Sequence, residues 1–85
     1  MEEIVVGRVE KFFSRIGVAA IKITEGELKI GDTIRIKGHT TDFEQKIESM
    51  QVEHVPVDKA QKGQDVGIKV KEKVREGDLV YILKE

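Results

Sequence analysis

The sequence predicts an all-β fold, a small closed barrel of six or seven strands with Greek-key-like connections. Three glycine turns, centred on Gly31, Gly63 and Gly77, each lead into a run in which apolar and polar residues alternate. Glycine reaches positive φ without steric cost, and alternation with a period of two marks a strand that buries one face. Aromatic residues make up only 5% of the chain, so Ile, Val and Leu supply the expected core. Closing such strands into a barrel removes free strand edges.

The first strand is expected at residues 4–9, where apolar residues predominate. Strict alternation places Val5, Gly7 and Val9 on one face, with the intervening apolar side chains on the other. Residues 11–15, which include two phenylalanines and Arg15, are expected to form a connection.

The second and third strands are expected at residues 16–24 and 33–37. In both segments isoleucine or alanine alternates with polar or small residues, which predicts one buried face. The inward positions are Ala19, Ile21, Ile23, Ile34 and Ile36.

The longest strand is expected at residues 43–54, with Pro56 ending it. Its apolar positions change parity along the segment, which indicates a bulge near Glu48 or Ser49. Two further strands are expected at residues 66–70 and 79–83.

The chain of 85 residues is long enough for one domain with a modest core, which we expect to span residues 1–85. It contains no cysteine, and no segment approaches the roughly 18 apolar residues of a membrane-spanning helix. The acidic N-terminus is unlike a signal peptide, so a cytoplasmic protein is expected. Charged residues make up 36% of the chain, mostly Lys and Glu, a balance found in hyperthermophile proteins and equally in an ordinary soluble surface.

The inventory of reactive side chains favours no catalytic function. His39 and His54 are the only histidines, and too few metal-binding residue types accompany either one to form a metal site. No nucleophile motif accompanies Ser14 or Ser49. We therefore expect no catalytic residues, no metal and no cofactor.

The order of motifs resembles a known family. The segments at residues 28–34, 47–51, 60–67 and 76–80 look like the second domain of the translational GTPases, the β-barrel of elongation factor Tu and its relatives. A similar barrel is appended to some U32-family peptidases. The resemblance covers the whole chain, but no phosphate loop is present, so neither nucleotide binding nor GTP hydrolysis is expected.

The resemblance implies a role in binding. In the elongation factors this domain helps to hold the aminoacylated end of tRNA, and residues 63–67 match the stretch involved. Asp65 stands where those factors usually carry Asn, and an acidic residue facing a phosphate would repel it.

Two groups of polar residues are the candidate binding residues. The loop at residues 38–42 offers His39, Thr40, Thr41 and Asp42, although such residues are also ordinary turn formers. Alternation would place Lys69, Lys71 and Lys73 on one strand face, where they serve either to hold an RNA backbone or to protect an exposed strand from pairing. Arg15, near the exposed one of two phenylalanines, is a further candidate.

The expected function is a non-catalytic binding module of translation-factor type that contacts RNA or a ribosome-associated protein. A different class of function stays open, a protein-interaction module that partners a separately encoded enzyme, as the peptidase-appended barrels indicate. The net charge of −1 gives no global attraction to nucleic acid, so RNA binding would need a local basic patch.

Overall fold

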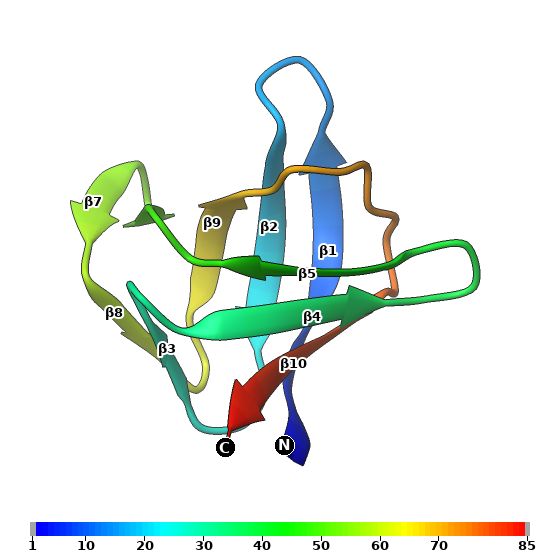
Figure 1. Ribbon diagram of the computed structural model, residues 1–85. Helices are drawn as coiled ribbons and strands as arrows, with labels where there is room; N and C mark the ends of the chain where they lie inside the picture. Colours follow the sequence, from blue (N-terminus) through cyan, green and yellow to red (C-terminus); the bar gives the residue numbers. More distant parts are fainter. Residues whose placement is uncertain (1, 85) are drawn as a thin grey trace.

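The computed structural model describes residues 2–84 and contains ten strands and no helix. The strands lie in a strongly twisted arrangement in which β4 and β5 cross in front of β1, β2 and β9 (Figure 1). Their bounds are β1 (Glu2–Phe13), β2 (Val18–Ile23), β3 (Glu27–Lys29), β4 (Thr33–Lys37), β5 (Asp42–Lys46), β6 (Met50–Val52), β7 (Val55–Val57), β8 (Lys59–Gln61), β9 (Asp65–Lys69) and β10 (Leu79–Lys84).

Eight strands form one antiparallel sheet, and the other two form a small separate sheet. The order in the large sheet is β5-β4-β10-β1-β2-β9-β6-β7, and β3 pairs with β8. The predicted all-β class is therefore confirmed. Within residues 2–84 no backbone pairing joins the edge strands β5 and β7, so the sheet is not closed into a barrel by its ladder.

The core lies between the two halves of this folded-over sheet. Its members are aliphatic apart from Phe43 and Met50, as the composition predicts, and the inward positions predicted for β2 and β4 are confirmed. The largest fully buried side chains are Ile21, Ile23, Leu28, Ile34, Ile36, Ile47, Met50 and Ile68.

The predicted faces of β1 are wrong because the strand is bulged. Pairing with β10 shifts between Val5 and Gly7, so Val6 turns inward and is buried, whereas Val5 is exposed. A bulge adds one residue to one strand and reverses the parity beyond it. A second shift, between Val9 and Lys11, lets β1 continue to Phe13, so residues 11–13 belong to the strand rather than to a connection.

The single long strand predicted at residues 43–54 is also wrong. Ile47 leaves the sheet because its backbone pairs with the turn before β4: its N–H donates to Asp32 O (2.8 Å) and its carbonyl accepts from Gly31 N–H (2.9 Å). The chain then reverses at Glu53 and His54, both at positive φ, so that β6 pairs with β7. Pro56 lies within β7, an edge strand, where a residue without an N–H is tolerated.

The three glycine turns are confirmed, and they share one hydrogen-bonding scheme. Gly31, Gly63 and Gly77 have φ values of 98°, 92° and 91°. In each turn the residue after glycine donates its N–H to the carbonyl three residues back, and its side-chain oxygen accepts the N–H of that same residue. The pairs are Lys29 with Asp32, Gln61 with Gln64, and Arg75 with Asp78.

The two ends of the described chain lie side by side. Glu2 is the register partner of Lys84, because β1 and β10 are antiparallel neighbours. The turn that joins β1 to β2 lies at the opposite end of the molecule (Figure 1).

Candidate functional site

The turn between β1 and β2 presents an exposed aromatic ring with a lysine ammonium group over it. Phe13 is 41% exposed, and the Nζ of Lys11 lies 5.2 Å from the centre of its ring. The turn closes tightly, since the N–H groups of Ile16 and Gly17 both donate to Phe13 O. Arg15 lies in this turn. As expected, one phenylalanine is exposed near Arg15, while Phe12 packs against the core.

A groove of about 430 Å³ runs from this turn over β2 and β9 to the β6–β7 turn. Phe13 and Ile16, which is 62% exposed, form one end. The middle of the groove lies over Ala20 and its register partner Gly67, two small residues that leave room for a flat group.

The far rim of the groove is polar and partly acidic. Glu53 and His54 reach it from the β6–β7 turn, and Asp65 reaches it from the start of β9. The Asp65 carboxylate lies 3.9 Å from the Lys22 ammonium, a pairing that offsets part of its charge.

A second hollow, of about 420 Å³, lies where β5 approaches the end of β9. Lys46, Ser49, Lys69 and Lys71 line it. We call it the seam hollow. Lys69 is the last residue of β9, so Lys71 and Lys73 lie beyond the strand, and their predicted placement on one strand face is wrong.

A third hollow, of about 450 Å³, lies beside the β4–β5 loop and gathers the other predicted residues. His39, Thr40, Thr41 and Asp42 line it together with Lys73. Thr41 is only 5% exposed, and its carbonyl accepts the N–H of Gly38 at 2.7 Å. The structure thus distributes the predicted residues over three places: Arg15 at the turn, Lys69 and Lys71 at the seam hollow, and the rest here.

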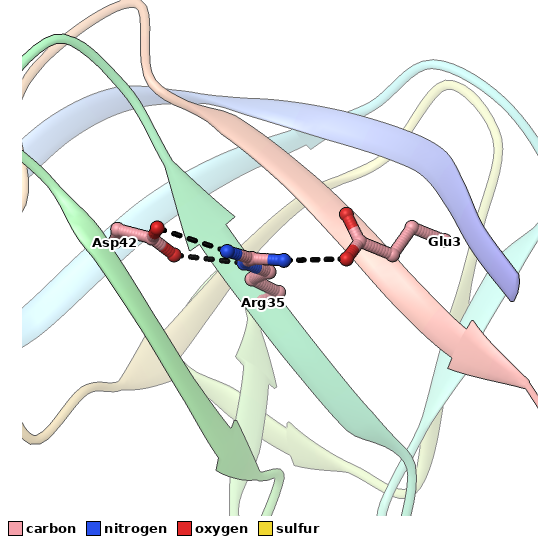
Figure 2. Close-up of polar contacts among 3 residues, drawn as sticks. All are labelled: Glu3, Arg35 and Asp42. Carbon is pink, nitrogen blue, oxygen red and sulfur yellow. Dashed lines mark hydrogen bonds and ion pairs between the residues drawn. The ribbon is translucent and has the colours of Figure 1, made fainter. Parts of the chain in front are cut away.

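Asp42 belongs to an ion-pair cluster that spans three strands. The guanidinium of Arg35 on β4 donates to both carboxylate oxygens of Asp42 on β5, at 2.7 and 2.9 Å, and to Glu3 on β1 (Figure 2). Hydrogen bonding from Arg35 lowers the pKa of Asp42, and hydrogen bonding to Asp42 and then Glu3 raises the pKa of Arg35. This cluster ties the edge strand β5 to the sheet.

Sequence reasoning missed the residues that shape the groove and the seam hollow. Gln45, Gln51 and His54 received no binding role, because each side chain acquires its neighbours only when distant strands meet. Within residues 2–84 no three His, Cys, Asp or Glu side chains gather as metal ligands would. That same stretch contains no helix long and apolar enough to cross a membrane.

Comparison with known proteins places the chain in a family. The model of the family described as elongation factor Tu domain 2 matches residues 17–81. The chain belongs to this family. The elongation factor Tu domain 2 match covers the seam hollow and most of the groove, but it begins after Phe13 and Ile16, which form the end of the groove at the β1–β2 turn.

Curated relatives of this domain 2 chain are much longer proteins. It is 49% identical over 84 residues to an uncharacterized protease of Methanocaldococcus jannaschii and 51% identical over 81 residues to a collagenase of Porphyromonas gingivalis. These matches cover 98% and 94% of this chain but 20% of each relative. The chain therefore spans about a fifth of their length.

Solved structures share the fold. Two crystal structures of the C-terminal domain of a Geobacillus thermoleovorans protein assigned to the U32 peptidases superpose with TM-scores of 0.84 and 0.86, at 24% identity. They cover 89% and 96% of this chain, which matches 95% and 93% of theirs. The resemblance to both families predicted from the motifs is confirmed.

Proposed function

We propose that this domain is a non-catalytic binding module that holds a segment of single-stranded RNA in the groove over β2 and β9. The observation that carries the proposal is the exposed ring of Phe13, with Lys11 over it and Arg15 in the same turn, at one end of a groove of about 430 Å³. Proteins that hold single strands combine stacking on aromatic rings with cations that follow the backbone.

The rest of the groove has the properties that a stacked base requires. Ala20 and Gly67 leave a shallow apolar floor, and the side chains of Gln51 and His54 supply polar groups for the edge of a base. The acidic rim at Glu53 and Asp65 would repel phosphates, so the backbone runs along the other side, near Arg15 and Lys69.

The proposal includes three finer statements. The domain does not bind or hydrolyse nucleotides by itself and carries no catalytic residue. It acts in the cytoplasm. Its sheet works as a closed barrel, in which the Gln45 side chain bridges β5 to the end of β9 where backbone pairing is absent.

Titration of labelled single-stranded RNA decamers, followed by fluorescence anisotropy, tests the proposal. Phe13→Ala is expected to weaken binding by about 1–3 kcal/mol, the size of one lost stacking contact, and Phe13→Trp is expected to preserve it. Ile30→Ala is the matched control, because Ile30 is exposed on a distant turn. Equal affinity of Phe13→Ala and the unchanged chain would contradict the proposal, as would no binding at all.

A second function, docking onto an enzyme, is favoured by the relatives. Proteins named protease and collagenase carry a closely similar segment in a much longer chain. In that case Ile16 and Phe13 would pack against protein. The two functions differ in salt dependence, because RNA affinity falls steeply with salt whereas apolar docking does not.

A further inference from the structure

The seam hollow between β5 and β9 is a basic site outside the groove. Three lysines line it, Lys46, Lys69 and Lys71, together with the exposed hydroxyl-bearing Ser49 and a single carboxylate, Glu48. The whole chain carries a net charge of −1, whereas the residues that line this hollow carry a net positive charge.

Gln45 builds one wall of the hollow and positions its lysines. The Gln45 side chain donates from Nε2 to Lys69 O at 2.8 Å and accepts the N–H of Lys71 at Oε1 at 2.9 Å. One amide thus binds the backbone on both sides of Val70, as a neighbouring strand would. These two hydrogen bonds hold the backbone of Lys69 and Lys71 in place beside β5.

The three lysines of the hollow take part in no ion pair among the described residues. Over residues 2–84, the ion pairs within 4.0 Å involve other cations, namely Lys22, Arg35, Lys59 and Lys62. Lys46, Lys69 and Lys71 therefore keep their ammonium groups available to an anion. Lysine binds phosphate as a compact point charge, and a hydroxyl adds a neutral donor.

The segments that line the hollow and the groove are neighbours in the sheet. Phe13, Val18 and Lys69 are register partners across β1, β2 and β9, and neighbouring strands lie about 4.8 Å apart. The N–H of Val70 also donates to Gly17 O at 2.9 Å, which binds the segment between the two lysines to the β1–β2 turn. An RNA segment that stacks on Phe13 therefore has to cross only β2 to reach Lys69 at the hollow.

We propose that the seam hollow binds phosphate groups, and that these belong to the backbone of the RNA strand whose bases occupy the groove. The inference rests on the proposed function for the identity of the strand. Lys46, Lys69 and Lys71 neutralise the phosphates and Ser49 donates a hydrogen bond. Binding at the hollow does not depend on base sequence, because no base edge is read there.

The decisive measurement is the salt dependence of RNA binding by the double variant Lys46→Gln, Lys71→Gln. Each neutralised phosphate of a single strand contributes about 0.7 to the slope of log affinity against log salt, so the slope should become shallower by about 1.4. The charge-matched control is Lys29→Gln, Lys84→Gln, which removes two exposed lysines outside both sites and should leave the slope unchanged.

A variant that is expected to bind RNA more tightly provides a second test, because misfolding would weaken binding and could not strengthen it. Glu48→Gln removes the only carboxylate of the hollow and is expected to raise affinity for the decamer about two-fold, the size of a screened surface charge. Unchanged or weaker binding by Glu48→Gln, with an unchanged slope for the lysine double variant, would overturn the inference.

Inorganic pyrophosphate, titrated while amide chemical shifts are recorded, separates this inference from the proposed function. Shifts at Ser49 and Lys71 that vanish in the double variant, together with Phe13-dependent RNA binding, support both. If RNA binds, the double variant keeps the original salt slope and pyrophosphate causes no shifts, the inference about the hollow is overturned and the proposed function stands. If pyrophosphate causes these shifts but RNA does not bind, the phosphates do not come from RNA, and the proposed function fails. The hollow is then a site for small phosphate compounds.

Discussion

Gly38 is a residue at which one added methyl group would be costly. A Cβ on Gly38 would collide with the carboxylate of Asp78, which is only 5% exposed. That carboxylate cannot move freely, because it accepts the N–H of Arg75 at 2.9 Å and closes the turn before β10. The close approach joins the β4–β5 loop to that turn.

Gly38→Ala is therefore expected to lower the free energy of unfolding by about 1–3 kcal/mol, the usual cost of overpacking a buried site. Urea denaturation measures the difference. Gly67→Ala is the matched control, since a Cβ there meets Val18 Cγ1 at 3.4 Å, an ordinary contact. A Gly38→Ala chain as stable as the Gly67→Ala chain would show that Asp78 is not held in place.

Asp42 gives the protein a defined response to acid. Hydrogen bonding from Arg35 lowers the pKa of Asp42 in the folded state below its usual value of about 3.9. A carboxyl group whose pKa falls on folding stabilises the fold above its unfolded pKa, and this contribution is lost as pH falls through the folded pKa. The stabilisation is thus present at neutral pH and disappears in acid.

Thermal unfolding between about pH 5 and about pH 2 tests this linkage. The melting temperature of the unchanged chain is expected to fall more over this range than that of Asp42→Asn. Asp58→Asn serves as the control, because it replaces an exposed carboxylate at another position. Parallel curves for Asp42→Asn and the unchanged chain would mean that the Arg35 contact does not contribute in solution.

The three glycine turns act as one repeated element, because each has the same pair of hydrogen bonds around its glycine. Asp32→Ala removes the acceptor for the Lys29 N–H and is expected to cost about 0.5–1.5 kcal/mol, the net value of one hydrogen bond. Asp32→Asn keeps the carbonyl oxygen and should cost much less. Equal losses for both variants in urea denaturation would refute the shared scheme.

Strands with a local signal could be predicted from the sequence, and those shaped by distant partners could not. The strands β4, β9 and β10 follow glycine turns and keep strict alternation, so all three could be predicted as strands from the local sequence. The faces of β1 depend on bulges opposite β10 and β2, and the break after β5 depends on Ile47 pairing with a turn sixteen residues earlier. The change of parity near Glu48 marks an irregularity in the strand, but no local pattern identifies the distant partners in either pairing.

The same distinction between local signals and distant contacts applies to the candidate site. Residue type alone singled out Arg15, Lys69 and Lys71 as cations, but not the hollow that Gln45 shapes around two of them. A glutamine in a strand resembles any exposed polar residue. Its role exists only because β5 crosses β9, a contact between segments 24 residues apart or more.

At the scale of the whole molecule, the paired ends allow a test of how the fold is connected. Glu2 and Lys84 are register partners, so a short glycine–serine linker can join them. A circular permutant opened between His39 and Thr40, in the exposed β4–β5 loop, is expected to fold and to bind RNA as the unchanged chain does.

Circular dichroism and the anisotropy titration measure both properties. A permutant opened between Val66 and Gly67 is the control and is expected not to fold, because it cuts β9 between two of its partner strands. Failure of the His39–Thr40 permutant to fold would show that the β4–β5 loop is required as a continuous chain.

The pairing of Glu2 with Lys84 also determines how the domain would behave on a tether. Any polypeptide joined at either end is anchored on the side away from the β1–β2 turn, as the positions of the ends and the turn show (Figure 1). The Phe13 end of the groove then lies at the opposite end of the domain from its attachment point. A ligand captured there is held at high effective concentration near whatever the tether carries, without any new contact between the two bodies.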